Sequence, residues 1–182
     1  MLPSPAIPDE VFAAEVHSLV AWRDWDMLPE FRTLTWNGKG LGVGTLAVLA
    51  DVPPQGYPQV IKAVADREIA AQLAQDEPGL AGFALVVEVF AAPVPDAPDE
   101  RDRLYADAAA RRVHARPDAV EMLLVHVADL QGRIWSAMRR RDTGKVTEAF
   151  HPTVADGPSG TFPRALRDAA ACARTALRGA AR

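Results

Sequence analysis

The sequence predicts an α+β fold, with a mixed or mainly antiparallel sheet of about five strands covered by N-terminal, central and C-terminal helices. Two turns that contain glycine, N-G-K-G and L-Q-G-R, lie between β-type segments and predict hairpins. Apolar residues at helical spacing recur at the beginning, middle and end of the chain. This order includes both hairpins and helical crossovers, which favours helices packed on a sheet. We expect one α+β domain over residues 1–182.

The first half of the chain predicts a helix, a hairpin and a second helix. Residues 8–22 open with a proline and two acidic residues and carry an apolar stripe, as expected for a helix start. Residues 28–36 alternate with period two and lead through N-G-K-G into 42–50, which predicts paired strands. Residues 59–75 predict one helix after the break P-P-Q-G-Y-P. Residues 1–7 are expected to be flexible.

The second half opens with the most apolar segment, L-A-G-F-A-L-V-V-E-V-F at 80–90. Its length and β-branched content predict a central strand. The elements that follow are a proline- and acid-rich connector at 93–100, a helix at 101–113, a hairpin that begins with 121–128, a short strand at 146–150 and a helix at 162–178.

Composition argues against several classes of protein. The chain has 182 residues and a net charge of -4, so no global basic field recruits nucleic acid. A single cysteine, Cys172, cannot form an internal disulfide, which fits a reducing compartment. No apolar run approaches the roughly 18 residues of a membrane helix, and the amino terminus lacks a positive segment. We expect a cytoplasmic protein with no membrane contact, no metal and no cofactor.

Two ionisable residues interrupt otherwise apolar strands. His126 falls opposite residues 135–137 if the turn is centred on L-Q-G-R, beside an indole or a hydroxyl. Glu88 is a carboxylate among apolar neighbours. If their strands are neighbours in the right register, the two form a pocket with acid/base capacity, in which the carboxylate raises the pKa of His126 and desolvation opposes it. A structural or solvent-facing role for both residues is the alternative that we favour.

A second polar group lies in R-R-V-H-A-R-P-D-A-V-E, residues 111–121. It contains one histidine and no spacing typical of a metal site. We interpret it as a salt-bridged junction, in which Pro117 ends a helix and Asp118 helps form the turn. The candidate catalytic residues are therefore His126 and Glu88, with His114, Glu121 and Arg139 in support.

Arginine recurs on the C-terminal helix at Arg164, Arg167, Arg174 and Arg178. Such a face could hold phosphates or a nucleic-acid backbone weakly. The chain uses arginine far more than lysine throughout, and nearby acidic residues dilute the positive field. Solvation of this face is the interpretation that we favour over nucleic-acid contact.

Three segments carry a resemblance to known sequences: L-A-G-F-A-L-V-V-E-V-F, H-A-R-P-D-A-V-E-M and V-A-D-L-Q-G-R-I-W. In this order they resemble small uncharacterised proteins of actinobacteria and of their phages or mobile elements. The resemblance spans Leu28 to about Arg141 and implies no activity.

Three tryptophans, Trp22, Trp25 and Trp36, fall close together near the first helix and hairpin, and tryptophan is enriched at interface anchors, although packing of such indoles into the core is the commoner outcome. We therefore hypothesise a non-catalytic interaction or accessory protein that binds a protein partner through an exposed sheet edge or a tryptophan-bearing surface. Self-association would also protect an exposed sheet edge, so we favour a homodimer over a monomer. The alternative is a small enzyme or ligand-binding domain that uses Glu88 and His126.

Overall fold

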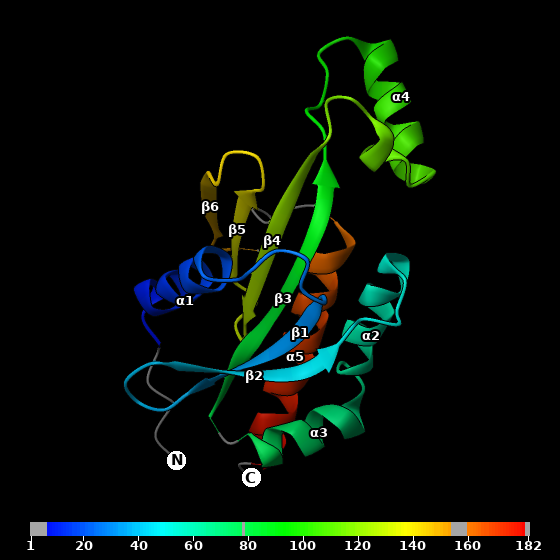
Figure 1. Ribbon diagram of the computed structural model, residues 1–182. Coiled ribbons are helices and arrows are strands. Elements are labelled where there is room, and N and C mark those ends of the chain that lie inside the picture. Colours follow the sequence, from blue (N-terminus) through cyan, green and yellow to red (C-terminus); the bar gives the residue numbers. More distant parts are fainter. Residues whose placement is uncertain (1–6, 78, 154–159, 181–182) are drawn as a thin grey trace.

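The computed structural model describes residues 7–77, 79–153 and 160–180 (Figure 1). The predicted flexible segment 1–7 lies outside these residues except for Ile7. The strands are β1 (Glu30–Trp36), β2 (Leu41–Val48), β3 (Leu80–Ala91), β4 (Val120–Asp129), β5 (Ile134–Arg140) and β6 (Val146–His151). The helices are α1 (Asp9–Ala21), α2 (Tyr57–Ala63), α3 (Arg67–Asp76), α4 (Pro98–Ala109) and α5 (Thr161–Ala180), with short 3-10 turns η1 (Pro54–Gly56) and η2 (Val113–Ala115).

Within the described residues, the strands form one sheet in the order β2-β1-β3-β4-β5-β6. All neighbouring strands are antiparallel. This arrangement confirms the predicted α+β fold. The sheet has six strands where about five were expected, because the segment after R-D-T-G-K does pair with β5.

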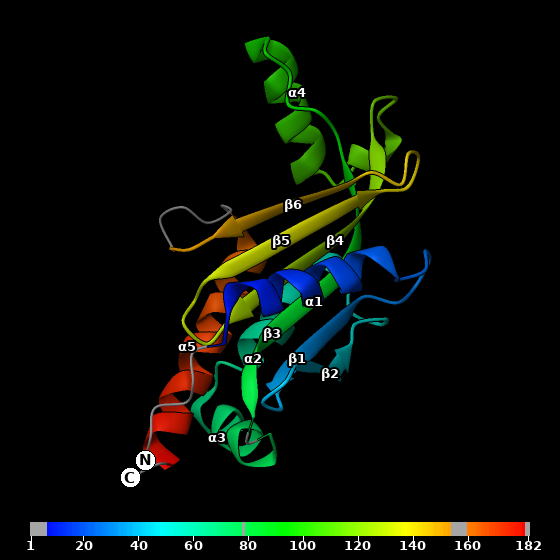
Figure 2. The same cartoon turned by 90° about the vertical axis from the view of Figure 1, so that its left-hand side faces the viewer.

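Helices cover both faces of the sheet. On one face, the α1 face, α1 crosses β4 and β5, whereas α5 packs on the opposite α5 face together with α2 and α3 (Figures 1 and 2). The alternation of side chains along each strand divides the apolar residues between two cores. Large buried residues on the α1 face include Phe12, Val20, Leu34, Leu123 and Trp135, and those on the α5 face include Phe31, Ile61, Phe83, Leu85 and Leu166.

Tight turns fix the register of two hairpins. In the first, the side chain of Asn37 accepts hydrogen bonds from the N–H groups of Lys39 and Gly40, both at 2.9 Å. In the second, the buried carboxylate of Asp129 accepts from the N–H groups of Gln131 and Arg133 at 2.9 and 2.8 Å. Both turns contain a glycine with positive φ, a conformation that other residues seldom adopt.

The predicted single helix at 59–75 is wrong, because the chain forms α2 and α3 with a break between them. The side chain of Asp66 accepts hydrogen bonds from the N–H groups of Glu68 and Ile69 at 2.9 and 3.3 Å. These bonds cap the free donors at the start of a new helix.

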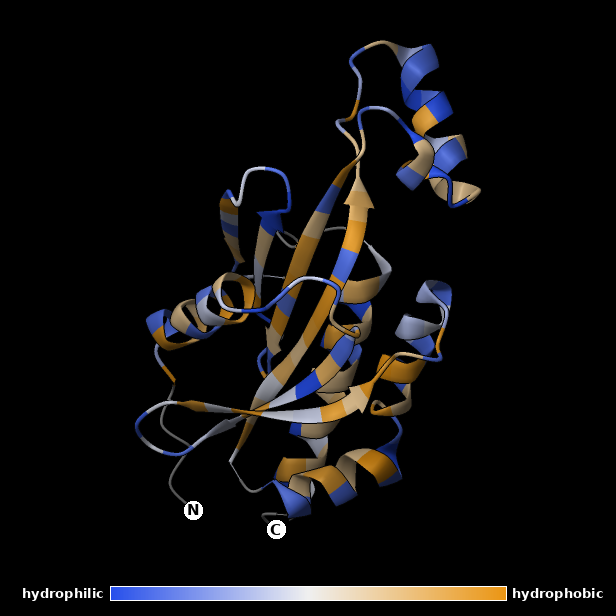
Figure 3. Ribbon diagram, in the orientation of Figure 1, coloured by the Kyte–Doolittle hydropathy of each residue, from blue (hydrophilic) through white to orange (hydrophobic). Residues whose placement is uncertain are grey.

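The connection between β3 and β4 carries α4 beyond the rest of the sheet (Figures 1 and 2). This helix begins at Pro98, so the last three residues of the predicted connector form its first turn instead. Apolar residues are concentrated along β3 and β4, whereas α4 is mainly hydrophilic (Figure 3). Among the helices described, none has both the length and the apolar character needed to cross a membrane.

Candidate functional site

Glu88 and His126 lie on opposite faces of the sheet. Residues that pair directly across two antiparallel strands point to the same side. His126 pairs with Leu85 of the α5 face, whereas Glu88 pairs with Leu123 of the α1 face. The predicted pocket in which these two side chains meet is therefore not formed.

His126 is buried against a hydroxyl group, one of the two neighbours that the turn position predicts. Its Nδ1 lies 2.7 Å from the hydroxyl oxygen of its cross-strand partner Ser136. Burial, together with the smaller effects of the nearby charges of His151 and Arg167, lowers the pKa of His126 to about 4. The imidazole is therefore neutral at pH 7, and the pKa moves in the direction opposite to the one expected from a neighbouring carboxylate.

Three of the predicted site residues, Glu88, Glu121 and Arg139, share the α1 face. Glu121 and Arg139 belong to this face because they alternate along β4 and β5 with residues of its core. Carboxylate oxygens of Asp26, Glu88 and Glu121 lie within 4.8 Å of one another. The backbone N–H of Met27 donates to Glu88 at 3.3 Å.

The guanidinium of Arg141 pairs with two of these three carboxylates. It donates two hydrogen bonds to Asp26, at 2.8 and 2.6 Å, and one to Glu121 at 3.0 Å. The hydrogen bond from Arg141 lowers the pKa of Asp26. Carboxylate oxygens are the ligands that hard cations such as Ca²⁺ prefer. Here Asp26 and Glu121 instead form ion pairs with Arg141, and these ion pairs hold the loop after α1 against β4.

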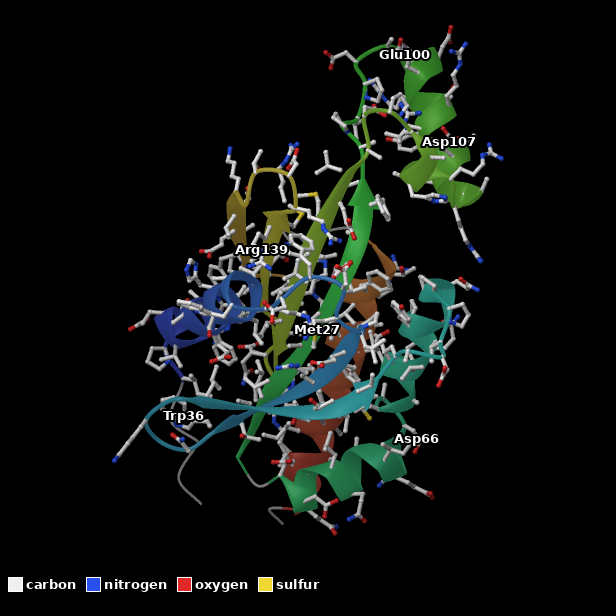
Figure 4. The ribbon with its side chains drawn as sticks, in the orientation of Figure 1. Met27, Trp36, Asp66, Glu100, Asp107 and Arg139 are labelled. Atoms are coloured by element: carbon white, nitrogen blue, oxygen red, sulfur yellow. The ribbon has the colours of Figure 1, made fainter. Side chains whose placement is uncertain are left out.

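Arg139 holds the C-terminal end of α1. Its Nη1 donates to the carbonyl oxygen of Ala21 at 2.6 Å, and its Nη2 donates to that of Arg23. The ring of Trp25 lies 5.0 Å from the guanidinium of Arg139 and 5.3 Å from that of Arg141. Figure 4 places Arg139 and Met27 on the α1 face. These contacts give Arg139 a structural role, because a cation is favourable at a helix C-terminus.

His114 stands apart in the α4 region. It is exposed, and its ring meets the edge of Phe90 at 6.0 Å between centroids. Nearby, Arg116 bridges Asp107 of α4, labelled in Figure 4, and Asp118, at 3.2 and 3.0 Å. These ion pairs agree with the predicted salt-bridged junction between the helix and the strand. The predicted role of Pro117 is wrong, because α4 already ends at Ala109.

The arginines of α5 do not form one uniform basic face. Arg164 and Arg178 are exposed, whereas Arg167 is partly buried and donates to the carbonyl oxygen of Gly132 at 3.3 Å. Burial lowers the pKa of Arg167. Nucleic-acid contact through this helix stays a prediction, and the inward turn of Arg167 weakens it.

A groove lies between α1, the following loop and the first hairpin. Its volume is about 430 Å³, and its lining residues are Glu15, Ser18, Leu19, Trp22, Arg23, Asp24, Met27, Arg32 and Val43. The side chain of Trp22 is 83% exposed at this groove. Trp25 and Trp36 instead pack against the α1-face core. Of the three tryptophans, Trp22 therefore has the exposure that an interface anchor requires.

β2 forms an edge of the sheet, and no other described strand pairs with its outer side. The N–H of Asn37 donates to the carbonyl of Gly40 at 3.3 Å and closes the hairpin. Hydrogen-bonded pairs alternate along an antiparallel ladder, so Gly42 and Gly44 bond to β1. The residues whose backbone N–H and C=O groups point outward are Leu41, Val43 and Thr45.

The sequence pointed to three tryptophans without distinguishing Trp22 from the other two, and it did not indicate the groove. Glu15 carried no visible signal, because an acidic residue next to the apolar stripe of a helix usually faces solvent. No protein-family model, curated protein or solved structure matches the chain.

Proposed function

We propose that this chain is a non-catalytic protein-binding module, whose β2 edge receives an extended segment of a partner protein by strand addition. The observation that carries the proposal is the composition of β2, L-G-V-G-T-L-A-V, which contains no charged residue and no proline. Natural sheets usually protect an edge with such residues, and an unprotected edge is a template for another strand. The unpaired Cys172 is compatible with a cytoplasmic location.

The geometry of β2 also limits where a partner strand adds. The register of β2 against β1 shifts after Thr45, which marks a bulge. The straight part of the edge is therefore Leu41–Thr45. A segment of about five residues suffices to pair with it, and its alternate side chains would lie beside Val43 on the α1 face.

Hydrogen exchange tests this proposal with linear peptides selected from a random display library against the whole protein. In the free protein, the amides of Gly42 and Gly44 should exchange slowly because they bond to β1. The amides of Leu41, Val43 and Thr45 should exchange fast and become protected when a selected peptide binds. Selected peptides that leave these three amides unprotected would contradict strand addition at β2.

Thr45→Pro provides the blocking variant. Proline removes an N–H that points away from the sheet, a position at which edge strands tolerate it. The variant should keep the thermal stability of the protein and lose peptide binding. Thr45→Val retains the N–H and is the matched control, which should bind as the wild type does.

The same edge could also take a second copy of this chain, in line with the predicted homodimer. The absence of charge on β2 removes the repulsion that otherwise keeps like edges apart. Sedimentation across the micromolar range should then show a dimer for Thr45→Val and a monomer for Thr45→Pro. A wild-type mass that stays monomeric at all these concentrations would reject self-association.

A further inference from the structure

The groove beside β2 contains two carboxylates, Glu15 and Asp24. Among the described residues, Glu15 and Asp24 form no hydrogen bond or ion pair, although both line the groove. Glu15 is partly buried, and this burial raises its pKa, an effect that Arg32 partly offsets. A desolvated carboxylate gains stability when a cation approaches it.

The two arginines of the groove are already paired. Arg23 donates to Glu30 at 3.1 Å and also to the carbonyl oxygen of Leu28. Arg32 pairs with the same carboxylate of Glu30. One carboxylate pairs with two guanidinium groups, so this cluster keeps one positive charge. With the negative charges of Glu15 and Asp24 added, negative charge still exceeds positive charge at the groove.

The apolar lining suits the stem of a long basic side chain. Leu19, Met27 and Val43 contribute apolar surface, and the indole of Trp22 is 83% exposed. Arginine and lysine lay their methylene groups on such surfaces and keep the charged end in a polar environment. An exposed indole is also able to bind a cation on its face.

From these observations we infer that the segment added at β2 is basic, and that an arginine or lysine side chain of it enters this groove and pairs with Glu15. The inference rests on the proposed function, because strand addition brings the segment to the groove. Val43 belongs to both features: its backbone groups point toward the added strand, and its side chain lines the groove. A side chain next to Val43 on the α1 face is therefore directed toward Glu15 and Trp22.

An acidic or apolar segment fits this groove less well. An acidic side chain would face the unpaired carboxylates of Glu15 and Asp24, and like charges repel. An apolar side chain would bury Glu15 further without a partner, which costs free energy.

The peptides selected against the whole protein test the inference. We expect their sequences to share a basic residue, and replacement of this residue by norleucine should weaken binding about tenfold, the effect of one lost charge-assisted hydrogen bond. Glu15→Gln should weaken binding of the basic peptide by a similar factor and leave the norleucine peptide unaffected. Glu10→Gln, an exposed position on the same helix, is the matched control and should change neither affinity.

The outcomes separate the inference from the proposed function. Peptides that bind in a manner blocked by Thr45→Pro, yet retain full affinity after norleucine replacement, would overturn the inference and leave strand addition standing. Basic peptides that bind equally well to Glu15→Gln and wild type would overturn it too. If none of the selected peptides loses binding to the Thr45→Pro variant, the proposed function and the inference are both wrong.

Discussion

Nδ1 of His126 and the hydroxyl oxygen of Ser136 lie 2.7 Å apart between β4 and β5, under the helix that covers the α5 face. The histidine that interrupts an apolar strand is thus partnered within the sheet. Its role follows from this bond and from burial, and both favour a structural residue over a general base.

Stability should depend on pH through His126. Burial, with smaller effects from His151 and Arg167, lowers its pKa from 6.5 to about 4 in the folded protein. The unfolded chain therefore binds a proton between these pH values while the folded chain does not, so stability is complete above pH 6.5 and falls as the pH falls toward 4. The difference between the two pKa values corresponds to roughly 3 kcal/mol.

Urea unfolding of wild type and His126→Gln at pH 7.0, 5.5 and 4.5 measures this dependence. The loss of unfolding free energy from pH 7.0 to 4.5 should be smaller in His126→Gln by about 2 kcal/mol. Parallel pH dependence in the two proteins would show that His126 does not titrate in this range.

His126 and Glu88 should act independently. They lie on opposite faces of the sheet, so the destabilising effects of His126→Gln and Glu88→Gln should add within about 0.5 kcal/mol. A double-mutant cycle of His126→Gln and Ser136→Ala should instead show a coupling free energy of about 1 kcal/mol, because these two side chains are in contact. Coupling in the first cycle and none in the second would contradict the register described for β3 and β4.

Arg139→Met should destabilise the protein by about 2 kcal/mol. The methionine preserves part of the apolar stem, but the carbonyl groups of Ala21 and Arg23 lose a charged donor. Chemical denaturation measures the loss, and hydrogen exchange should show faster opening of residues 22–29. Arg140→Met is the control: Arg140 pairs with exposed Asp142, and its loss should cost less than about 0.5 kcal/mol. Equal effects of the two substitutions would refute the structural role of Arg139.

Gly82→Ala should destabilise the pairing of β3 and β4. A Cβ atom at Gly82 would lie 2.3 Å from the carbonyl oxygen of Ala128, so one backbone must move. We expect a loss of about 2 kcal/mol or more in thermal or chemical unfolding. Gly40→Ala places its Cβ where no atom lies within 4 Å and serves as the matched control. A Gly82→Ala protein as stable as Gly40→Ala would disprove this close approach.

The sequence predicts a neighbour correctly where a short turn sets the register. L-Q-G-R joins β4 and β5 directly, so counting from the turn limited the neighbour of His126 to residues 135–137, and Ser136 is the one that pairs with it. β3 and β4 are joined by a long segment that contains α4, and counting cannot fix which of their residues pair. Since side chains alternate, an error of one residue reverses the face, and the meeting of Glu88 with His126 could not be decided from the sequence.

Long, strongly patterned elements were predicted well, and breaks within helical patterns were not. The apolar run of β3 indicated a central strand, which has β1 and β4 as neighbours. The break between α2 and α3 depends on a capping side chain, Asp66, inside a pattern whose apolar spacing continues across it. The groove depends on the path of the loop after α1, which long-range hydrogen bonds from Arg139 and Arg141 determine.

The strand order also has a consequence for how the chain folds. Within the described sheet, every pair except β1–β3 joins strands that follow each other in the chain, so this seam divides the sheet into β1–β2 and β3–β6, although the connection from β3 to β4 through α4 is also long. The seam between them requires a closure across α2 and α3, and contacts at greater sequence separation form more slowly because a longer loop must be ordered first. We therefore expect the seam to form late in folding. An intermediate with an open seam would expose Phe83 and Leu85 of β3, which are buried in the folded protein. Such an intermediate could aggregate, or two molecules could exchange their first hairpins in a domain swap.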